Sequence, residues 1–153
     1  MATESTLSIE QVRVLKGGRW TMSRTQRWSE VYNPSTGQVI GRVPMCTAEE
    51  AGQVVEAAAA ALPGWAETPV VERARVMFRF RELVKEHFEE LARIITGECG
   101  KTLVEARGEL QRGIENVEVA CGIPLMLQGY NSEDIAAGID EIMIRQPLGV
   151  VAA

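Results

Sequence analysis

Gly100, Lys101 and Thr102 are the first residues that suggest chemistry, because a glycine followed by lysine and threonine ends the phosphate-binding loop of many nucleotide-binding proteins. That loop needs another glycine five residues earlier, so that backbone N–H groups can surround the phosphate. Position 95 is an isoleucine, and the residues before it follow a helical pattern. The three residues therefore predict a helix end near Gly97 and a new helix that starts near Gly100.

The three cysteines are candidate nucleophiles, since a thiolate is the attacking form. Cys46 and Cys99 lie next to predicted helix starts, which can lower a thiol pKa, but neither has a base close in sequence. Cys121 falls on an apolar helical stripe and is predicted to be a core residue. The single histidine, His87, is predicted to lie on a solvated helix surface among glutamates. One histidine without a Cys-x-x-Cys pair predicts no zinc site.

Paired acidic residues occur three times, at Glu49–Glu50, Glu89–Glu90 and Asp140–Glu141. They fit a first helical turn, a polar helix face and a strand, and nothing in their surroundings would desolvate them for acid–base work. The chain also lacks the Gly-x-Gly-x-x-Gly pattern of dinucleotide-binding turns. The residues themselves therefore predict no catalytic, no cofactor-binding and no metal-binding residue in this chain.

The elements that must position everything else lie in residues 68–129, which read as two long amphipathic helices joined at 96–102. The apolar stripe of the first helix consists of Ala74, Met77, Phe78, Val84, Phe88, Leu91, Ile94 and Ile95. The stripe of the second consists of Ala106, Leu110, Gly113, Val117, Ala120 and Cys121. Burial of each large apolar side chain contributes about 1.5–3 kcal/mol, so the two stripes are expected to be covered.

The residues before these helices predict a hairpin and a shorter helix. Residues 29–44 read as two strands around the turn residues 33–37. Thr47 and Glu50 form a capping box at the start of an alanine-rich helix. Pro63–Gly64 is predicted to end that helix, which leaves Trp65 in a connection that packs on the core.

The two ends of the chain are less regular in pattern. Residues 1–16 are predicted to form an arm, followed by a turn that leads to an anchoring Trp20. Residues 129–138 are polar and rich in turn residues, and 139–145 read as a half-buried strand with Ile142 and Ile144 on one face. The apolar run 148–153 resembles the opening of a buried strand, so we expect the chain to be an N-terminal piece of a longer protein.

Composition excludes several classes of function. The 153 residues carry a net charge of −5 with basic and acidic side chains interleaved, so the sequence predicts no nucleic-acid partner. No apolar run reaches the length of a membrane span, which predicts no membrane partner. The first residues lack the apolar segment of a secretory signal, and three scattered cysteines predict no disulfide framework. A cytoplasmic location fits these features.

An ordered set of short strings resembles the aldehyde dehydrogenase superfamily from about residue 17 to residue 153. They are Tyr32-Asn33-Pro34-Ser35-Thr36-Gly37, Ile40-Gly41-Arg42-Val43-Pro44, the alanine-rich helix near Trp65, Glu72-Arg73-Ala74, Gly100-Lys101-Thr102 and Pro147-Leu148-Gly149-Val150-Val151. A narrower set is similar to the CoA-acylating methylmalonate-semialdehyde dehydrogenase branch: residues 112–118, 120–124 and 144–149.

The resemblance implies an α/β fold class: the N-terminal part of an NAD-binding domain of the aldehyde dehydrogenase type, here mostly long helices with a β-hairpin and a protruding strand. It implies an NAD-dependent oxidoreductase that converts malonate or methylmalonate semialdehyde to acetyl-CoA or propionyl-CoA through a cysteine thioester, as in valine or inositol catabolism. NAD and the co-substrate CoA are implied for the full-length enzyme, and neither is expected to bind this chain.

The family's asparagine, lysine, cysteine and glutamate that carry the chemistry would follow residue 153, so no family site residue is transferred to this chain. The implied organisation is an N-terminal arm at 1–16, an incomplete NAD-binding domain at 17–137 and 147–153, and an oligomerisation-arm strand at 138–146. A homo-oligomer, tetramer or dimer, is implied for the complete protein. The alternative hypothesis is a complete, non-catalytic helical module that binds a partner through its long helices or through 139–145.

Overall fold

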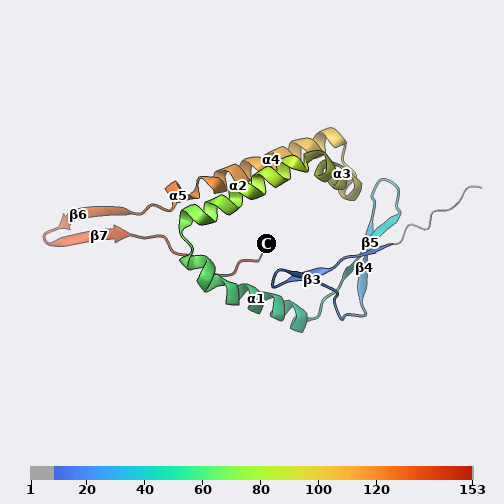
Figure 1. The fold of residues 1–153 in the computed structure, drawn as a ribbon, viewed down its shortest axis with the longest axis horizontal. Helices are drawn as coiled ribbons and strands as arrows, with labels where there is room; N and C mark the ends of the chain where they lie inside the picture. Colours follow the sequence, from blue (N-terminus) through green and yellow to red (C-terminus); the bar gives the residue numbers. More distant parts are fainter. Residues whose placement is uncertain (1–8, 153) are drawn as a thin grey trace, which may run out of the picture.

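The computed structural model describes residues 9–152, and its N-terminal part contains two small β-sheets (Figure 1). Strands β1 (Glu10–Gln11), β5 (Val39–Pro44) and β4 (Trp28–Tyr32) form one sheet in that order, with β1 parallel and β4 antiparallel to β5. The predicted hairpin at 29–44 is thus confirmed. Its turn is closed by the carbonyl of Asn33, which accepts the N–H groups of Thr36 and Gly37.

The second sheet is a hairpin of β2 (Val14–Lys16) and β3 (Arg19–Thr21). Gly17 and Gly18 connect them with φ of 56° and 75°, the left-handed pair that a two-residue hairpin turn requires. The predicted arm at 1–16 lies partly outside the described residues, at 1–8, while its described part forms β1 and β2. Trp20 was predicted to anchor the core, which is wrong, because its surface is 64% exposed.

Helix α1 (Ala48–Glu67) begins with the predicted capping box, in which Thr47 and Glu50 exchange side chain–backbone hydrogen bonds. The predicted end at Pro63–Gly64 is wrong, and Trp65 lies within the helix. A proline removes one backbone hydrogen bond, but the preceding alanines favour the helix strongly enough to continue it for another turn. The helix ends at Thr68, whose hydroxyl donates to the carbonyl of Gly64 at 2.8 Å.

The predicted pair of long helices is present, with one break. The first is divided into α2 (Val70–Glu86) and α3 (Phe88–Cys99) at His87, whose ψ of 17° leaves the helical range. The second is α4 (Leu103–Cys121), which is followed by the single-turn helix α5 (Ile123–Met126). The break lets α3 change direction, so that α2 and α3 both pack on α4 (Figure 1).

Small side chains fill the contact among these three helices. The buried apolar residues of the described chain are Ala74, Ala92, Ala106, Ile114 and Cys121. The predicted core role of Cys121 is confirmed, whereas Gly113 is exposed and its neighbour Ile114 takes the buried position. Alanines bring helix backbones close together, which explains how so few buried atoms hold three helices.

The predicted strand at 139–145 is present as β7 (Ile139–Met143), but it is not half-buried, since Ile142 is 72% exposed. The polar segment before it, predicted as turn-rich, forms β6 (Tyr130–Ala136), which pairs with β7 in an antiparallel hairpin. Two strands have only each other as neighbours, and this hairpin extends away from the helices (Figure 1). Residues 144–152 contain no regular element.

The folded chain exposes more surface to solvent than a compact monomer of the same mass does. A folded monomer of this mass exposes about 7,700 Å², whereas this chain exposes 12,090 Å². The excess of about 4,400 Å² includes many large apolar side chains on the helices and on β6–β7. None of the helices within residues 9–152 is long and apolar enough to cross a membrane.

Gly100 lies next to Pro34 of the turn between β4 and β5, and a substitution there tests whether this turn packs against the helices. Its φ is 72°, and a Cβ added there would lie 2.8 Å from Cγ of Pro34. We expect Gly100→Ala to destabilise the chain by about 1–3 kcal/mol, because it combines backbone strain with a steric clash.

Thermal unfolding followed by circular dichroism measures the effect of Gly100→Ala. Gly108→Ala is the matched control, since Gly108 lies within α4 and an added Cβ meets no atom within 4 Å. The control should stabilise the chain by up to about 1 kcal/mol. A melting temperature of Gly100→Ala at or above the wild-type value would show that Pro34 does not pack on this corner.

Candidate functional site

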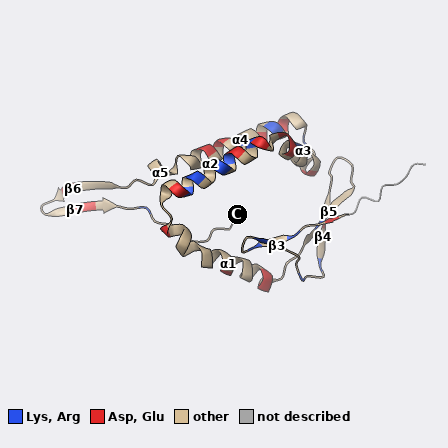
Figure 2. Ribbon diagram, viewed as in Figure 1, with Lys and Arg blue, Asp and Glu red and all other residues tan. Residues whose placement is uncertain are grey.

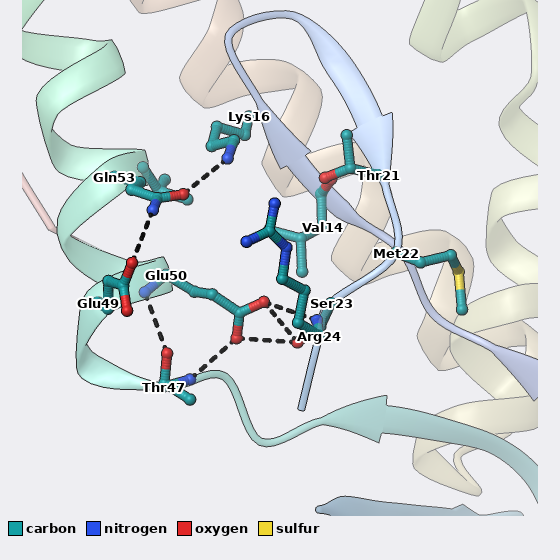
Figure 3. Close-up of a pocket in the computed structure, with 11 residues that line it drawn as sticks. Val14, Lys16, Thr21, Met22, Ser23, Arg24, Thr47, Glu49, Glu50 and Gln53 are labelled. Carbon is teal, nitrogen blue, oxygen red and sulfur yellow. Dashed lines mark hydrogen bonds between the residues drawn. The ribbon is translucent and has the colours of Figure 1, made fainter. Parts of the chain in front are cut away.

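A polar hollow of about 310 Å³ lies between the start of α1 and the β2–β3 hairpin (Figure 3). The hairpin and the loop after it contribute one wall, and the first turns of α1 contribute the other. The residues that line it are Val14, Lys16, Thr21, Met22, Ser23, Arg24, Thr47, Glu49, Glu50, Gln53 and Val54. Most of the side chains that line it are polar or charged.

The carboxylate of Glu50 is the centre of this hollow and points from α1 toward Ser23 and Arg24 (Figure 3). The hydroxyl of Ser23 lies 2.9 and 3.0 Å from its two oxygens. The backbone N–H groups of Arg24 and Thr47 donate to it at 2.8 and 3.1 Å. Glu50 therefore joins a loop 26 residues earlier to the helix N-terminus that it also caps.

These contacts favour the ionised carboxylate. The pKa of Glu50 is lowered from its ordinary value, chiefly by the backbone N–H of Arg24, then by that of Thr47, and to a smaller extent by Ser23 and the charge of Arg24. A general acid or base at neutral pH needs the opposite shift, toward neutrality. The carboxylate is thus a structural acceptor whose lone pairs are already in use.

Lys16 and Glu49 complete the polar wall through Gln53. The Lys16 ammonium donates to the amide oxygen of Gln53 at 2.9 Å, and the amide nitrogen of Gln53 donates to Glu49 at 3.4 Å. This chain of contacts orients the rim of the hollow and brings no nucleophile next to a base. The capping motif identifies Glu50 from the sequence. No sequence motif links Ser23 or Arg24 to Glu50, so these two partners could not be predicted.

Gly100, Lys101 and Thr102 form a helix–helix connection, as the sequence predicts. Helix α3 ends at Cys99, two residues beyond the predicted end at Gly97, and Gly100 after it adopts the left-handed conformation. Thr102 caps α4, with Glu105 in a second capping box. Lys101 pairs with Glu109, which raises the pKa of its ammonium through a hydrogen bond. The Lys101 ammonium is therefore already paired with the carboxylate of Glu109 in α4.

The cysteines and the histidine lie on different elements. Cys46 precedes α1 and is exposed, Cys99 is exposed at the end of α3, and Cys121 is buried at the end of α4. His87 is exposed between α2 and α3, and its Nδ1 lies 2.9 Å from a carboxylate oxygen of Glu90. Among residues 9–152, no hydrogen bond joins a cysteine to the histidine, and no group of three or more potential metal ligands is found.

A second, open hollow occurs where α2 meets the end of α4, lined by Phe78, Arg81, Glu118, Cys121 and Gly122. Arg81 spans the two helices and donates to Glu118 at 2.7 Å. A similar bridge joins α3 to α4, where Arg107 holds both oxygens of Glu89 at 2.8 Å. Figure 2 shows basic and acidic residues interleaved along α2 and α4. These pairs hold α2 and α3 against α4.

Comparison with known proteins finds similarity to one family of enzymes. Residues 20–153 match the model of the Aldehyde dehydrogenase family. Malonate-semialdehyde dehydrogenase 2 of Oceanobacillus iheyensis is 44% identical over 144 residues, which cover 94% of this chain and 30% of that protein. Malonate-semialdehyde dehydrogenase 1 of Geobacillus kaustophilus is 49% identical over 136 residues, or 89% of this chain and 28% of that protein.

Solved structures give the same result at the level of the fold. The methylmalonate-semialdehyde dehydrogenase of Oceanimonas doudoroffii superposes with a TM-score of 0.86 at 41% identity, over 92% of this chain and 28% of that one. A Sinorhizobium meliloti protein complexed with NAD, provisionally assigned as a methylmalonate-semialdehyde dehydrogenase, has a TM-score of 0.87 at 35% identity, over 93% and 29%. The chain thus spans less than a third of the relatives it matches.

Glu50→Gln tests the role of the central carboxylate. We expect amide hydrogen exchange at Arg24 and Thr47 to become faster by about tenfold or more, because the charged acceptor of both N–H groups is lost. The adjacent Glu49→Gln is the matched control and should leave both amides unchanged, since Glu49 contacts only Gln53 in this hollow.

The same carboxylate predicts a pH dependence. A carboxyl whose pKa is lowered by folding stabilises the fold above its unfolded pKa, near 4.5 here, and that contribution is lost as the pH falls through the folded value. Protection of the Arg24 amide, corrected for intrinsic exchange, should therefore decline below about pH 4.5 in the wild type and show no such step in Glu50→Gln. An identical pH profile in both proteins would refute the assignment.

Proposed function

Because the chain belongs to the aldehyde dehydrogenase family, we propose that the whole protein is an NAD-dependent dehydrogenase of malonate or methylmalonate semialdehyde. The support is the identity of 44–49% to malonate-semialdehyde dehydrogenases of Oceanobacillus iheyensis and Geobacillus kaustophilus. The superposition on the Oceanimonas doudoroffii methylmalonate-semialdehyde dehydrogenase adds agreement of the fold over nearly the same residues.

We further propose that the product is acetyl-CoA or propionyl-CoA, formed from a thioester on a cysteine outside the 153 residues. The strings at 112–118, 120–124 and 144–149 support this CoA-acylating branch. Among the described residues, no hydrogen bond joins Cys46 or Cys99 to a histidine or a carboxylate, and Cys121 is buried. None of the three is therefore proposed as the nucleophile.

The described residues do not fit a dinucleotide. At the α1 N-terminus beside the polar hollow, the Glu50 carboxylate accepts the N–H of Thr47, and the Thr47 hydroxyl accepts the N–H of Glu50. The negative charges of Glu49 and Glu50 would repel a pyrophosphate placed there. We therefore assign no step of NAD chemistry to these residues. Their proposed role is that of a scaffold: the α2–α3–α4 unit and the N-terminal sheet support the part of the enzyme that binds NAD and substrate.

Two further features belong to this proposal. The β6–β7 hairpin is proposed to join subunits in a homo-oligomer, since it extends from the helices and exposes Ile135, Ile139 and Ile142 by more than half. The alternative, a non-catalytic helical module, depends on the same exposed surface. A reducing cytoplasmic location agrees with the free thiols of Cys46 and Cys99.

A chimera tests the proposed function. In Geobacillus kaustophilus malonate-semialdehyde dehydrogenase 1, the segment that matches this chain over 136 residues is replaced by the chain itself. We expect NADH formation from malonate semialdehyde to require both NAD and CoA, with kcat/KM within about tenfold of the parent, because the scaffold leaves the reacting groups in place.

The isolated 153-residue chain is the control for that assay and should form no NADH. Turnover by the isolated chain would place catalytic residues where none is assigned. A correctly folded chimera without turnover would show that this chain does not serve as such a scaffold and would favour the non-catalytic module.

A further inference from the structure

The hollow between α1 and the β2–β3 hairpin carries opposite charges on its two walls (Figure 3). Lys16 in β2 and Arg24 in the loop after β3 make the hairpin wall positive. Glu49 and Glu50 in the first turn of α1 make the other wall negative. Small-molecule sites have volumes of about 300–1,000 Å³, and the hollow, at about 310 Å³, lies at the lower end of that range. Its size and charges therefore suit a small polar ligand.

Lys16 and Arg24 keep their capacity to bind a carboxylate. The ion pairs found among residues 9–152 include neither of them. The Lys16 ammonium has three donors, and it donates to the neutral amide oxygen of Gln53. Arg24 binds Glu50 through its backbone N–H, whereas its guanidinium lies between the hairpin and α1 with no hydrogen bond to the other residues drawn (Figure 3). A carboxylate that enters the hollow can thus accept from both side chains.

Glu49 is the acceptor for a charge of the opposite sign. It is exposed on the first turn of α1, and its contact in the hollow is the amide nitrogen of Gln53 at 3.4 Å, which is longer than a typical N–H···O bond. Glu50, by contrast, already accepts the Ser23 hydroxyl and two backbone N–H groups. An ammonium group in the hollow would therefore bind Glu49 rather than Glu50.

The arrangement of these charges separates the possible classes of ligand. The amide of Gln53 contacts Lys16 through its oxygen and Glu49 through its nitrogen, so one amide group separates a positive from a negative side chain. A phosphate would be repelled by the two glutamates, and a metal cation would be repelled by the two basic side chains. A molecule with one carboxylate and one ammonium group meets an opposite charge at each end and leaves the balance of two cations and two anions unchanged.

We propose that this hollow is a binding site for a small zwitterion of the amino-acid class. The ligand carboxylate accepts hydrogen bonds from Lys16 and Arg24, and the ligand ammonium donates to Glu49. Val14 and Val54, which also line the hollow, contact the methylene groups between the two charges. A ligand that touches both walls stabilises the hairpin against α1. The inference is independent of the proposed function, since it involves neither NAD, CoA nor an aldehyde.

Titration of the 153-residue chain, followed by the chemical shifts of its backbone amides, tests the site. The probes are glycine, 4-aminobutanoate and 6-aminohexanoate, which differ in the separation of their charges, and acetate and ethylammonium, which carry one charge each. We expect one or more of the zwitterions to bind at least about tenfold more tightly than either single-charge probe, because only a zwitterion pairs with both walls. The shifts should change at residues 14–24 and 47–54.

Arg24→Gln and Glu49→Gln each remove one of the two charges that hold the ligand. Each should weaken binding of the tightest zwitterion by at least about tenfold, toward the affinity of a single-charge probe. Arg13→Gln is the matched control, since Arg13 is exposed and does not line the hollow, and it should change the affinity by less than about twofold. Protection of the Thr47 amide without ligand should be the same in all three variants, which shows that the hollow is still formed.

Three results would overturn the proposal. The first is binding of acetate or inorganic phosphate as tight as that of every zwitterion, or no binding of any probe. The second is an equal loss of affinity in Arg13→Gln, because attraction by the general positive charge of the hairpin would then explain the binding. The third comes from the Geobacillus kaustophilus chimera, in which the affinity should stay within about threefold of that of the isolated chain. Loss of binding there would show that another part of the whole protein fills the hollow.

Discussion

The close approach of α2 and α3 to α4 is the contact on which the rest of the structure depends. Ala74, Ala92 and Ala106 are almost completely buried, and small side chains at these positions allow the helix backbones to come together. Dispersion contacts fall off steeply with distance, so larger residues here would separate the helices and lose the packing of their neighbours. Ion pairs such as Arg107–Glu89 then fix the relative position of helices already in contact.

Local hydrogen bonds order the helix starts and the hairpin beside α1. The Thr47–Glu50 and Thr102–Glu105 capping boxes each satisfy backbone N–H groups with side chains only three residues away. Glu50 adds a long-range contact to Ser23, and it thereby fixes the β2–β3 hairpin against α1. Helices and hairpins therefore keep their form although a large apolar area stays in contact with solvent.

Buried helix contacts and local caps together suit the scaffold role proposed for these residues. The chain belongs to the aldehyde dehydrogenase family, and its buried contacts and caps give a preformed surface for other parts to pack against. A preformed surface loses little conformational entropy on docking, which favours assembly. The α2–α3–α4 unit and the β6–β7 hairpin then have separate proposed roles, one within a subunit and one between subunits.

The sequence by itself determined what depends on neighbours along the chain: the two capping boxes, the turn at Asn33–Gly37, the helix break at Gly100 and the amphipathic pattern of α2 to α4. It also determined the family, because the ordered strings resemble aldehyde dehydrogenases. It misplaced the end of α1, since the effect of Pro63 depends on the strength of the surrounding helix, and it missed the partner strand β6, whose polar residues look like a loop. Only the tertiary structure decided which apolar residues are covered, because burial depends on residues that are distant in sequence. The same periodicity that put Cys121 in the core left Val76, Phe80 and Leu83 of α2 in contact with water.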